Sequence, residues 1–86
     1  MTQIEKMLSR VLRGTSDRNT SFNDLCSLLR DLGFGERIKG DHHIFYREGI
    51  PDILNLQPKQ GMAKPYQVKQ VRQAILKYHL GGNSDD

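Results

Sequence analysis

The sequence predicts an α+β fold in which helices cover one face of a three-stranded antiparallel sheet. Three observations predict it: helical apolar spacing up to Leu32, short β-rich segments between turns from Phe34, and helical spacing again after Lys64. The order is α-β-β-β-α with an extra helix in front, and one face of the sheet stays open. At 86 residues we expect a single domain, residues 1–86, with one modest core.

The first predicted helix covers residues 4–13. Its apolar stripe consists of Ile4, Met7, Leu8, Val11 and Leu12. Gly14 ends it, because glycine readily adopts the left-handed conformation of a helix cap. Residues 15–20 are polar and aperiodic, so residues 1–20 form an extra N-terminal helix and loop. We expect this helix to cover core apolar surface; contact with a partner protein or a second copy are the alternatives.

The second predicted helix begins at Ser21, whose hydroxyl can cap it, and ends at Gly33. Three strands follow at residues 37–39, 42–47 and 53–57. The last helix begins near Pro65, which is favoured in a first helical turn. Its inward residues are expected to be Val68, Val71, Ile75 and Tyr78, with Lys69, Arg72 and Lys77 largely outside. The α-β-β-β-α core therefore spans residues 21–80, and residues 81–86 are expected to form a flexible tail.

Cysteine content and hydropathy predict a cytoplasmic protein. The single cysteine, Cys26, excludes an internal disulfide framework and suits a reducing compartment. No apolar run approaches the roughly 20 residues that a membrane span needs, so no membrane partner is expected.

The charge of the chain is unevenly distributed. The formal net charge is only +3, but no acidic residue lies between Asp52 and Asp85. A basic second half indicates a polyanionic partner, RNA or DNA, and a merely solvated basic face is the alternative.

Two adjacent histidines are the strongest candidates for chemistry. Because strand residues alternate between faces, His43 is expected on the core side with Phe45, which leaves His42 exposed. The unperturbed pKa of histidine lies near neutrality, so His42 can act as a general acid or base on RNA. Lys39, Lys59 and Lys64 could converge near it to stabilise phosphate charge. Asp41, His43 and Tyr46 are possible second groups, and a structural role for His42 is the alternative.

A metal site is not favoured by the spacing of the possible ligands. Cys26, His42, His43 and His79 lack the short repeated spacing of zinc sites, and adjacent strand histidines diverge. Cys26 is expected to be a small core residue. We therefore expect metal-independent chemistry without a cofactor.

The stretch Gly40-Asp41-His42-His43-Ile44-Phe45, within residues 21–80, resembles the HicA toxins of HicAB toxin–antitoxin systems. The resemblance implies a double-stranded-RNA-binding-domain-like fold and an endoribonuclease toxin (mRNA interferase) that cleaves mRNA and is neutralised by a HicB-like antitoxin. It implies that His42 is catalytic and that Gly40 brings it up to the turn. The family usually has serine where this chain has Asp41.

The expected RNA contacts are basic side chains and exposed rings. Phosphates would be held by Lys39, Lys59, Lys64, Lys69 and Arg72. Single strands would stack on rings such as Tyr46 or Tyr66, whereas a duplex would be read by its shape. Two alternatives remain open: a non-catalytic RNA-binding module of the same fold, and a protein-interaction domain.

Overall fold

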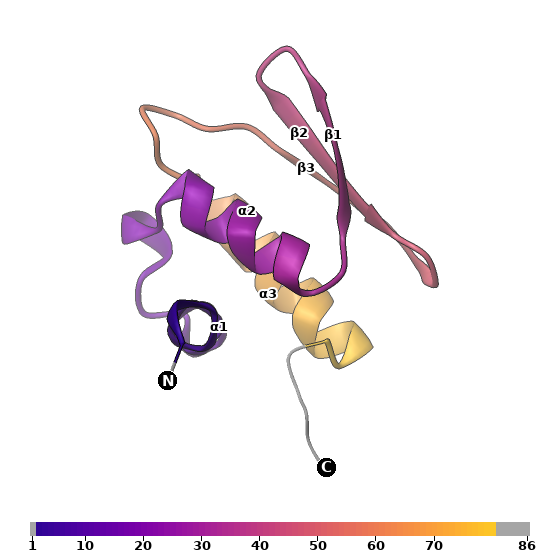
Figure 1. Cartoon of the computed structure of the whole chain (residues 1–86). Helices are drawn as coiled ribbons and strands as arrows, with labels where there is room; N and C mark the ends of the chain where they lie inside the picture. The colour runs from indigo at the N-terminus through magenta and orange to yellow at the C-terminus, as the bar shows by residue number, and fades with distance from the viewer. Residues whose placement is uncertain (1, 81–86) are drawn as a thin grey trace.

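The computed structural model describes residues 2–80 and shows an α+β fold of three α-helices and a three-stranded sheet (Figure 1). In order, the elements are α1 (Gln3–Arg13), a short 3-10 helix η1 (Asp17–Asn19), α2 (Phe22–Asp31), β1 (Gly35–Lys39), β2 (His42–Arg47), β3 (Ile50–Leu56) and α3 (Pro65–Tyr78). The predicted order of helices and strands is confirmed. The predicted tail, residues 81–86, lies outside the described residues. Among residues 2–80, no helix is long and apolar enough to cross a membrane.

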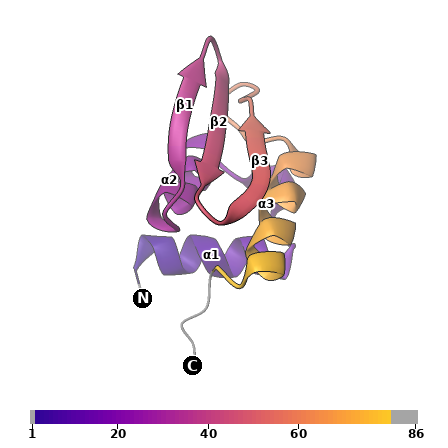
Figure 2. The same cartoon turned by 90° about the vertical axis from the view of Figure 1, so that its right-hand side faces the viewer.

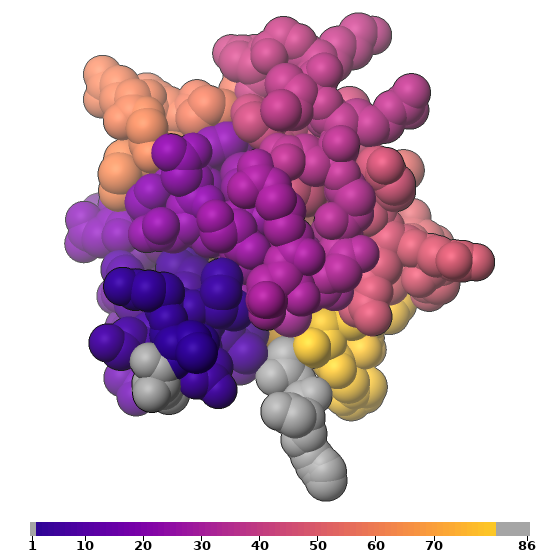
Figure 3. All heavy atoms as spheres, in the orientation of Figure 1, coloured from indigo at the N-terminus to yellow at the C-terminus, as the bar shows by residue number. Residues whose placement is uncertain are grey.

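The sheet is antiparallel in the order β1-β2-β3. The helices α2 and α3 cover one face, and α1 packs against both of them. Figure 2 looks onto the other face, which no helix covers. The space-filling view places α1 at the far end of the molecule from the tip of the β1–β2 hairpin (Figure 3). The sheet therefore has one core face and one open face, as expected.

The third strand begins at Ile50, earlier than the predicted Ile53. Gly49 has a φ of +88°, and the turn that it forms lets Ile50 pair with Arg47. Pro51 does not interrupt β3, since an edge strand tolerates a residue without an N–H group.

The core contains residues from all three α-helices and from β2 and β3. Its fully buried members include Phe45 and Leu56 from the sheet, Leu25, Leu28 and Leu29 from α2, and Val71 from α3. Met7 and Val11 of α1 belong to the same cluster, which confirms that the front helix covers core surface. Each such side chain contributes about 1.5–3 kcal/mol when fully buried.

The helix ends follow from local sequence. Ser21 Oγ accepts a hydrogen bond from the Asp24 N–H, as predicted for the start of α2. Gly14 has a φ of +72° and ends α1, also as predicted. A capping box between Thr2 and Glu5 starts α1.

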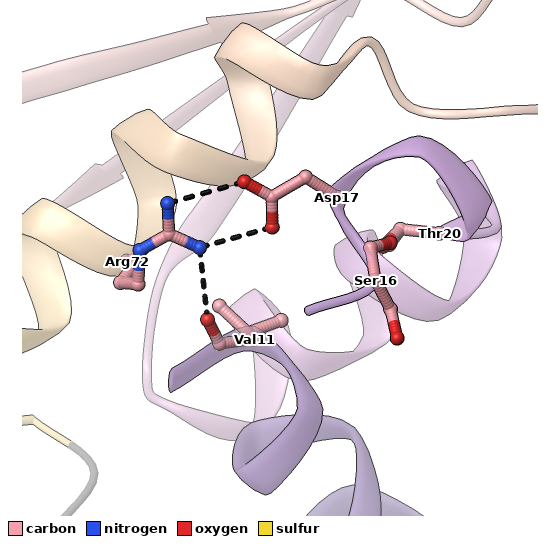
Figure 4. A network of polar contacts seen from close by, with 5 residues as sticks. All are labelled: Val11, Ser16, Asp17, Thr20 and Arg72. Carbon is pink, nitrogen blue, oxygen red and sulfur yellow. Dashed lines mark hydrogen bonds and ion pairs between the residues drawn. The ribbon is translucent and has the colours of Figure 1, made fainter. Parts of the chain in front are cut away.

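The expectation that Arg72 lies largely outside the fold is wrong. Its guanidinium donates to both carboxylate oxygens of Asp17, at 3.0 and 3.1 Å, and to the Val11 carbonyl at 3.1 Å (Figure 4). The side chains of Arg72 and Asp17 are only 17% and 22% exposed. Arg72 thus joins α3 to η1 and to the end of α1, and we exclude it from the candidate RNA contacts.

Candidate functional site

His42 occupies the first position of β2, directly after a two-residue turn. Gly40 and Asp41 form this turn, and Lys39 lies opposite His42 in the strand register. Gly40 has a φ of +63°, the positive value that a type II′ hairpin turn requires at its first central position. A Cβ at Gly40 would meet nothing within 4 Å, so its conformation and not its size calls for glycine.

The strand register assigns His42 to the open face. Phe45 is fully buried and pairs with Glu36 and Leu54, so these three residues face the helices. The alternate positions form the surface that we call the outer face of the sheet: Gly35, Arg37, Lys39, His42, Ile44, Tyr46, Ile53 and Asn55. The His42 side chain is 48% exposed, which confirms that it is the accessible member of the pair.

Asn55 of β3 orients the imidazole of His42. The distance from His42 Nδ1 to Asn55 Oδ1 is 3.1 Å. Because an amide oxygen can only accept, Nδ1 carries the hydrogen in this contact. A neutral His42 ring then has its lone pair on Nε2, and this nitrogen is the one available for proton transfer.

Asp41 places a negative charge beside that nitrogen. Its Oδ1 lies 4.0 Å from His42 Nε2, and its Oδ2 accepts a hydrogen bond of 2.9 Å from Gln57 Nε2. The hydrogen bond from Gln57 is the main cause that lowers the pKa of Asp41 below its ordinary value, with contributions from His42 and Lys64. Asp41 is therefore ionised at neutral pH and is placed to stabilise positive charge on the ring.

The predicted basic residues do not all lie beside His42. Lys39 pairs with it across the hairpin, and Lys64, at the start of α3, is close enough to influence Asp41. Lys59 is exposed in the loop after β3. Lys69 is exposed on α3, on the other side of the sheet from His42. The strand register therefore places Lys39 beside His42, Lys64 is linked to the site only through its charge on Asp41, and Lys69 is remote.

His43 has a different environment on the core face. Its Nδ1 lies 2.6 Å from Glu36 Oε2, and its ring packs edge-on against Phe22 with centroids 4.9 Å apart. Arg30 Nε donates to the other carboxylate oxygen of Glu36 at 2.8 Å. The hydrogen bond from Arg30, followed by that from His43, lowers the pKa of Glu36 below its ordinary value. His43 thus helps to hold α2 against the sheet. Its position on the core side agrees with the prediction from strand alternation.

Cys26 completes a cluster with these residues. Possible ligand atoms of Cys26, Glu36 and His43 lie within 4.8 Å of one another. Burial, followed by the charge of Glu36, raises the pKa of Cys26 to about 11, so its thiol is protonated at neutral pH. Both oxygens of Glu36 already accept hydrogen bonds from Arg30 and His43. The contacts in this cluster are those of a packed interface between α2 and the sheet.

His42 lies on open surface. Three hollows lie between α1 and α2, between α1 and the ends of α2 and α3, and between β3 and α3. His42 lines none of these three. An extended polymer can reach such a position more readily than a pocket-bound small molecule can be held there.

Asn55, Gln57 and Glu36 were not predicted as partners of the histidines. The signal for Asn55 was present, because Leu54 and Leu56 are buried and strand alternation turns Asn55 to the face of His42. Gln57 and Glu36 depend on the register of the sheet, which the sequence does not fix.

Comparisons of the chain with models of known protein families, with curated proteins and with solved structures found no match.

Proposed function

We propose that this protein is a cytoplasmic, metal-independent endoribonuclease toxin of the HicA type, which cleaves mRNA and is neutralised by a HicB-like antitoxin. The observation that carries the proposal is the half-exposed ring of His42, whose Nδ1 contacts Asn55 and thereby leaves Nε2 as the nitrogen for proton transfer. His42 belongs to the stretch Gly40–Phe45, in which the sequence resembles HicA toxins, and Asp41 is the one residue of that stretch that departs from the family's usual serine. The arrangement of α2, the sheet and α3 is compatible with the double-stranded-RNA-binding-domain-like fold that this resemblance implies.

In the proposed reaction His42 transfers one proton. Its Nε2 takes the proton from a ribose 2′-hydroxyl, or in its protonated form gives a proton to the leaving oxygen. Lys39 and Lys64 contribute positive charge near the reacting phosphate. A second group or a water molecule must complete the proton transfer, since one imidazole cannot serve both oxygens at once.

The second candidate is a non-catalytic RNA-binding module. The observation that favours it is the ionised Asp41 carboxylate, 4.0 Å from His42 Nε2, since this charge opposes a reacting phosphate at that nitrogen and leaves the rest of the outer face free to bind RNA. That candidate predicts salt-sensitive RNA binding without cleavage, and equal binding by the His42→Ala variant.

Controlled expression in a bacterial host distinguishes the two candidates. We expect the wild-type chain to arrest growth and to shorten mRNA lifetimes, and His42→Ala to do neither at the same protein level. His79→Asn is the control, because His79 is also exposed and its left-handed conformation, with a φ of +55°, suits asparagine. Growth arrest by His42→Ala at the wild-type level contradicts the catalytic assignment. A neighbouring reading frame for a HicB-like protein that restores growth would support the toxin assignment.

A further inference from the structure

The ring of Tyr46 lies on the backbone of Gly35. The two residues are paired in the β1–β2 register, and a Cβ atom built at Gly35 would lie 2.6 Å from Tyr46 Cζ and 2.8 Å from its hydroxyl oxygen. Any other residue at position 35 would displace the ring. Tyr46 nevertheless remains 45% exposed, so the ring is supported on one side and accessible on the other.

The charged strand residues on the face of this ring have one sign, whereas the acidic Asp41 and Glu48 lie in the turns before and after β2. Arg37 and Lys39 of β1 are exposed on the same outer face of the sheet. The two acidic residues within the strands point to the helices: Glu36 contacts Arg30, and Asp52 contacts Tyr78 and Lys77. Among strand residues 35–39, 42–47 and 50–56, the outer face therefore presents cationic side chains beside an aromatic ring and no carboxylate. This combination matches a polyanion that also offers flat bases.

The position of Tyr46 relative to His42 suits a strand that crosses the sheet. Both residues lie on the outer face of β2, four positions apart, which corresponds to about 13 Å along a strand. An extended nucleic acid covers that length in a few nucleotides. Figure 2 shows that no element obstructs the path along β2.

We infer that Tyr46, supported by Gly35, is a base-stacking subsite for single-stranded RNA, and that Arg37 holds a neighbouring phosphate. Bases in a duplex are already stacked, so only an unpaired base can occupy this ring. Tyr66 does not share these features, since it lies on α3, behind the sheet, and its ring is not among the atoms nearest to any glycine of residues 2–80. As a statement about RNA cleavage, this inference rests on the proposed function, and it adds that the substrate is single-stranded RNA.

A binding assay without cleavage tests this subsite. In the His42→Ala background, we expect Tyr46→Leu to weaken binding of a single-stranded oligoribonucleotide about 5- to 100-fold, the loss of one base–aromatic stack. Tyr46→Phe keeps the ring and should bind within about twofold of its parent. Tyr66→Leu is the matched control at another exposed tyrosine and should bind like its parent. Binding of an RNA duplex should be the same for all four proteins.

A fluorescent base reports the contact itself. An oligonucleotide that carries 2-aminopurine should lose fluorescence on binding the parent and the Tyr46→Phe protein, and not on binding Tyr46→Leu. Gly35→Ala, which displaces the ring without removing it, should also weaken single-strand binding. Thermal unfolding of each variant verifies that it is folded.

Three results would overturn the inference. They are equal single-strand binding by Tyr46→Leu and Tyr46→Phe, an equal loss for single and double strands, or a loss confined to binding of a protein partner. The assay separates this inference from the proposed function. A wild-type chain that binds through Tyr46 without cleaving RNA contradicts only the endoribonuclease, whereas cleavage through His42 with no effect of Tyr46→Leu contradicts only the subsite.

Discussion

Arg72 and Asp17 form a two-pronged ion pair that connects the last helix to the segment before α2. The same guanidinium also donates to the Val11 carbonyl, near the end of α1. Hydrogen bonding with Asp17 raises the pKa of Arg72 above its ordinary value. The front helix is thus attached to the fold by a polar contact as well as by the burial of Met7 and Val11.

Arg72→Lys should destabilise the fold although it preserves the charge. Lysine cannot reproduce the planar two-pronged contact, and we expect the free energy of unfolding to fall by about 1–3 kcal/mol. Asp17→Asn should have a similar effect, and the double variant should cost less than the sum of the two. Urea unfolding measures all three values.

The control for this pair is Asp52→Asn, which alters the exposed Asp52–Lys77 pair, 3.5 Å apart. We expect it to change the free energy of unfolding less than Arg72→Lys does, because solvent screens an exposed pair. Additive effects of Arg72→Lys and Asp17→Asn would show that the two side chains do not stabilise each other.

Glu36 should make the stability depend on pH in the acid range. Its pKa in the folded protein is lowered, chiefly by Arg30, so its contribution is complete above the ordinary glutamate pKa of about 4.3. The contribution is lost as the pH falls through the lower folded-state value, where the carboxylate is protonated. The stability difference between the wild type and Glu36→Gln should therefore be largest at neutral pH and shrink below about pH 4. Unfolding curves across this pH range measure it.

Glu48→Gln makes the same substitution at an exposed turn position and is the control for that series. A constant difference between wild type and Glu36→Gln from neutral to acid pH would show that the charge of Glu36 does not stabilise the fold.

Asn55→Ala should slow RNA cleavage more than it weakens RNA binding. Without the Asn55 oxygen, the ring of His42 is free to rotate and Nε2 no longer has one fixed direction. A reacting group that is misplaced by about 1 Å can lower kcat by about 10- to 100-fold. Asn55→Asp retains an acceptor for Nδ1 and should restore much of the rate. Steady-state kinetics on a short RNA separate kcat from KM, and a change confined to KM would argue for a binding role of Asn55 instead.

The sequence predicted the parts of the fold that depend on local pattern. The apolar spacing of α1 and α2, the cap at Ser21 and the split between His42 and His43 are confirmed, because each depends on residues close together in the chain. The predicted start of β3 was too late, because Pro51 and Asp52 are residues that seldom occur in strands. Here they belong to an edge strand, whose pairing is set by the turn at Gly49.

Contacts between distant segments could not be predicted in the same way. Arg72 and Asp17 are 55 positions apart, and their pairing requires the packing of α3 against η1. The contacts of His42 with Asn55 and of His43 with Glu36 both depend on strand register. Tyr46 was one of two candidate rings in the sequence. Its place on the outer face of β2 and its pairing with Gly35 distinguish it from Tyr66, which lies on α3.

The central claim is that His42 transfers a proton during RNA cleavage. Its most direct test is the single-turnover cleavage rate of a defined single-stranded RNA, measured in parallel with purified His42→Asn and His79→Asn proteins. Both variants make the same change at an exposed histidine. We predict that His42→Asn lowers the rate about 10²- to 10⁴-fold, the usual contribution of a general acid or base, and that His79→Asn leaves it unchanged. Equal rates for the two variants, with both proteins folded, would contradict the account.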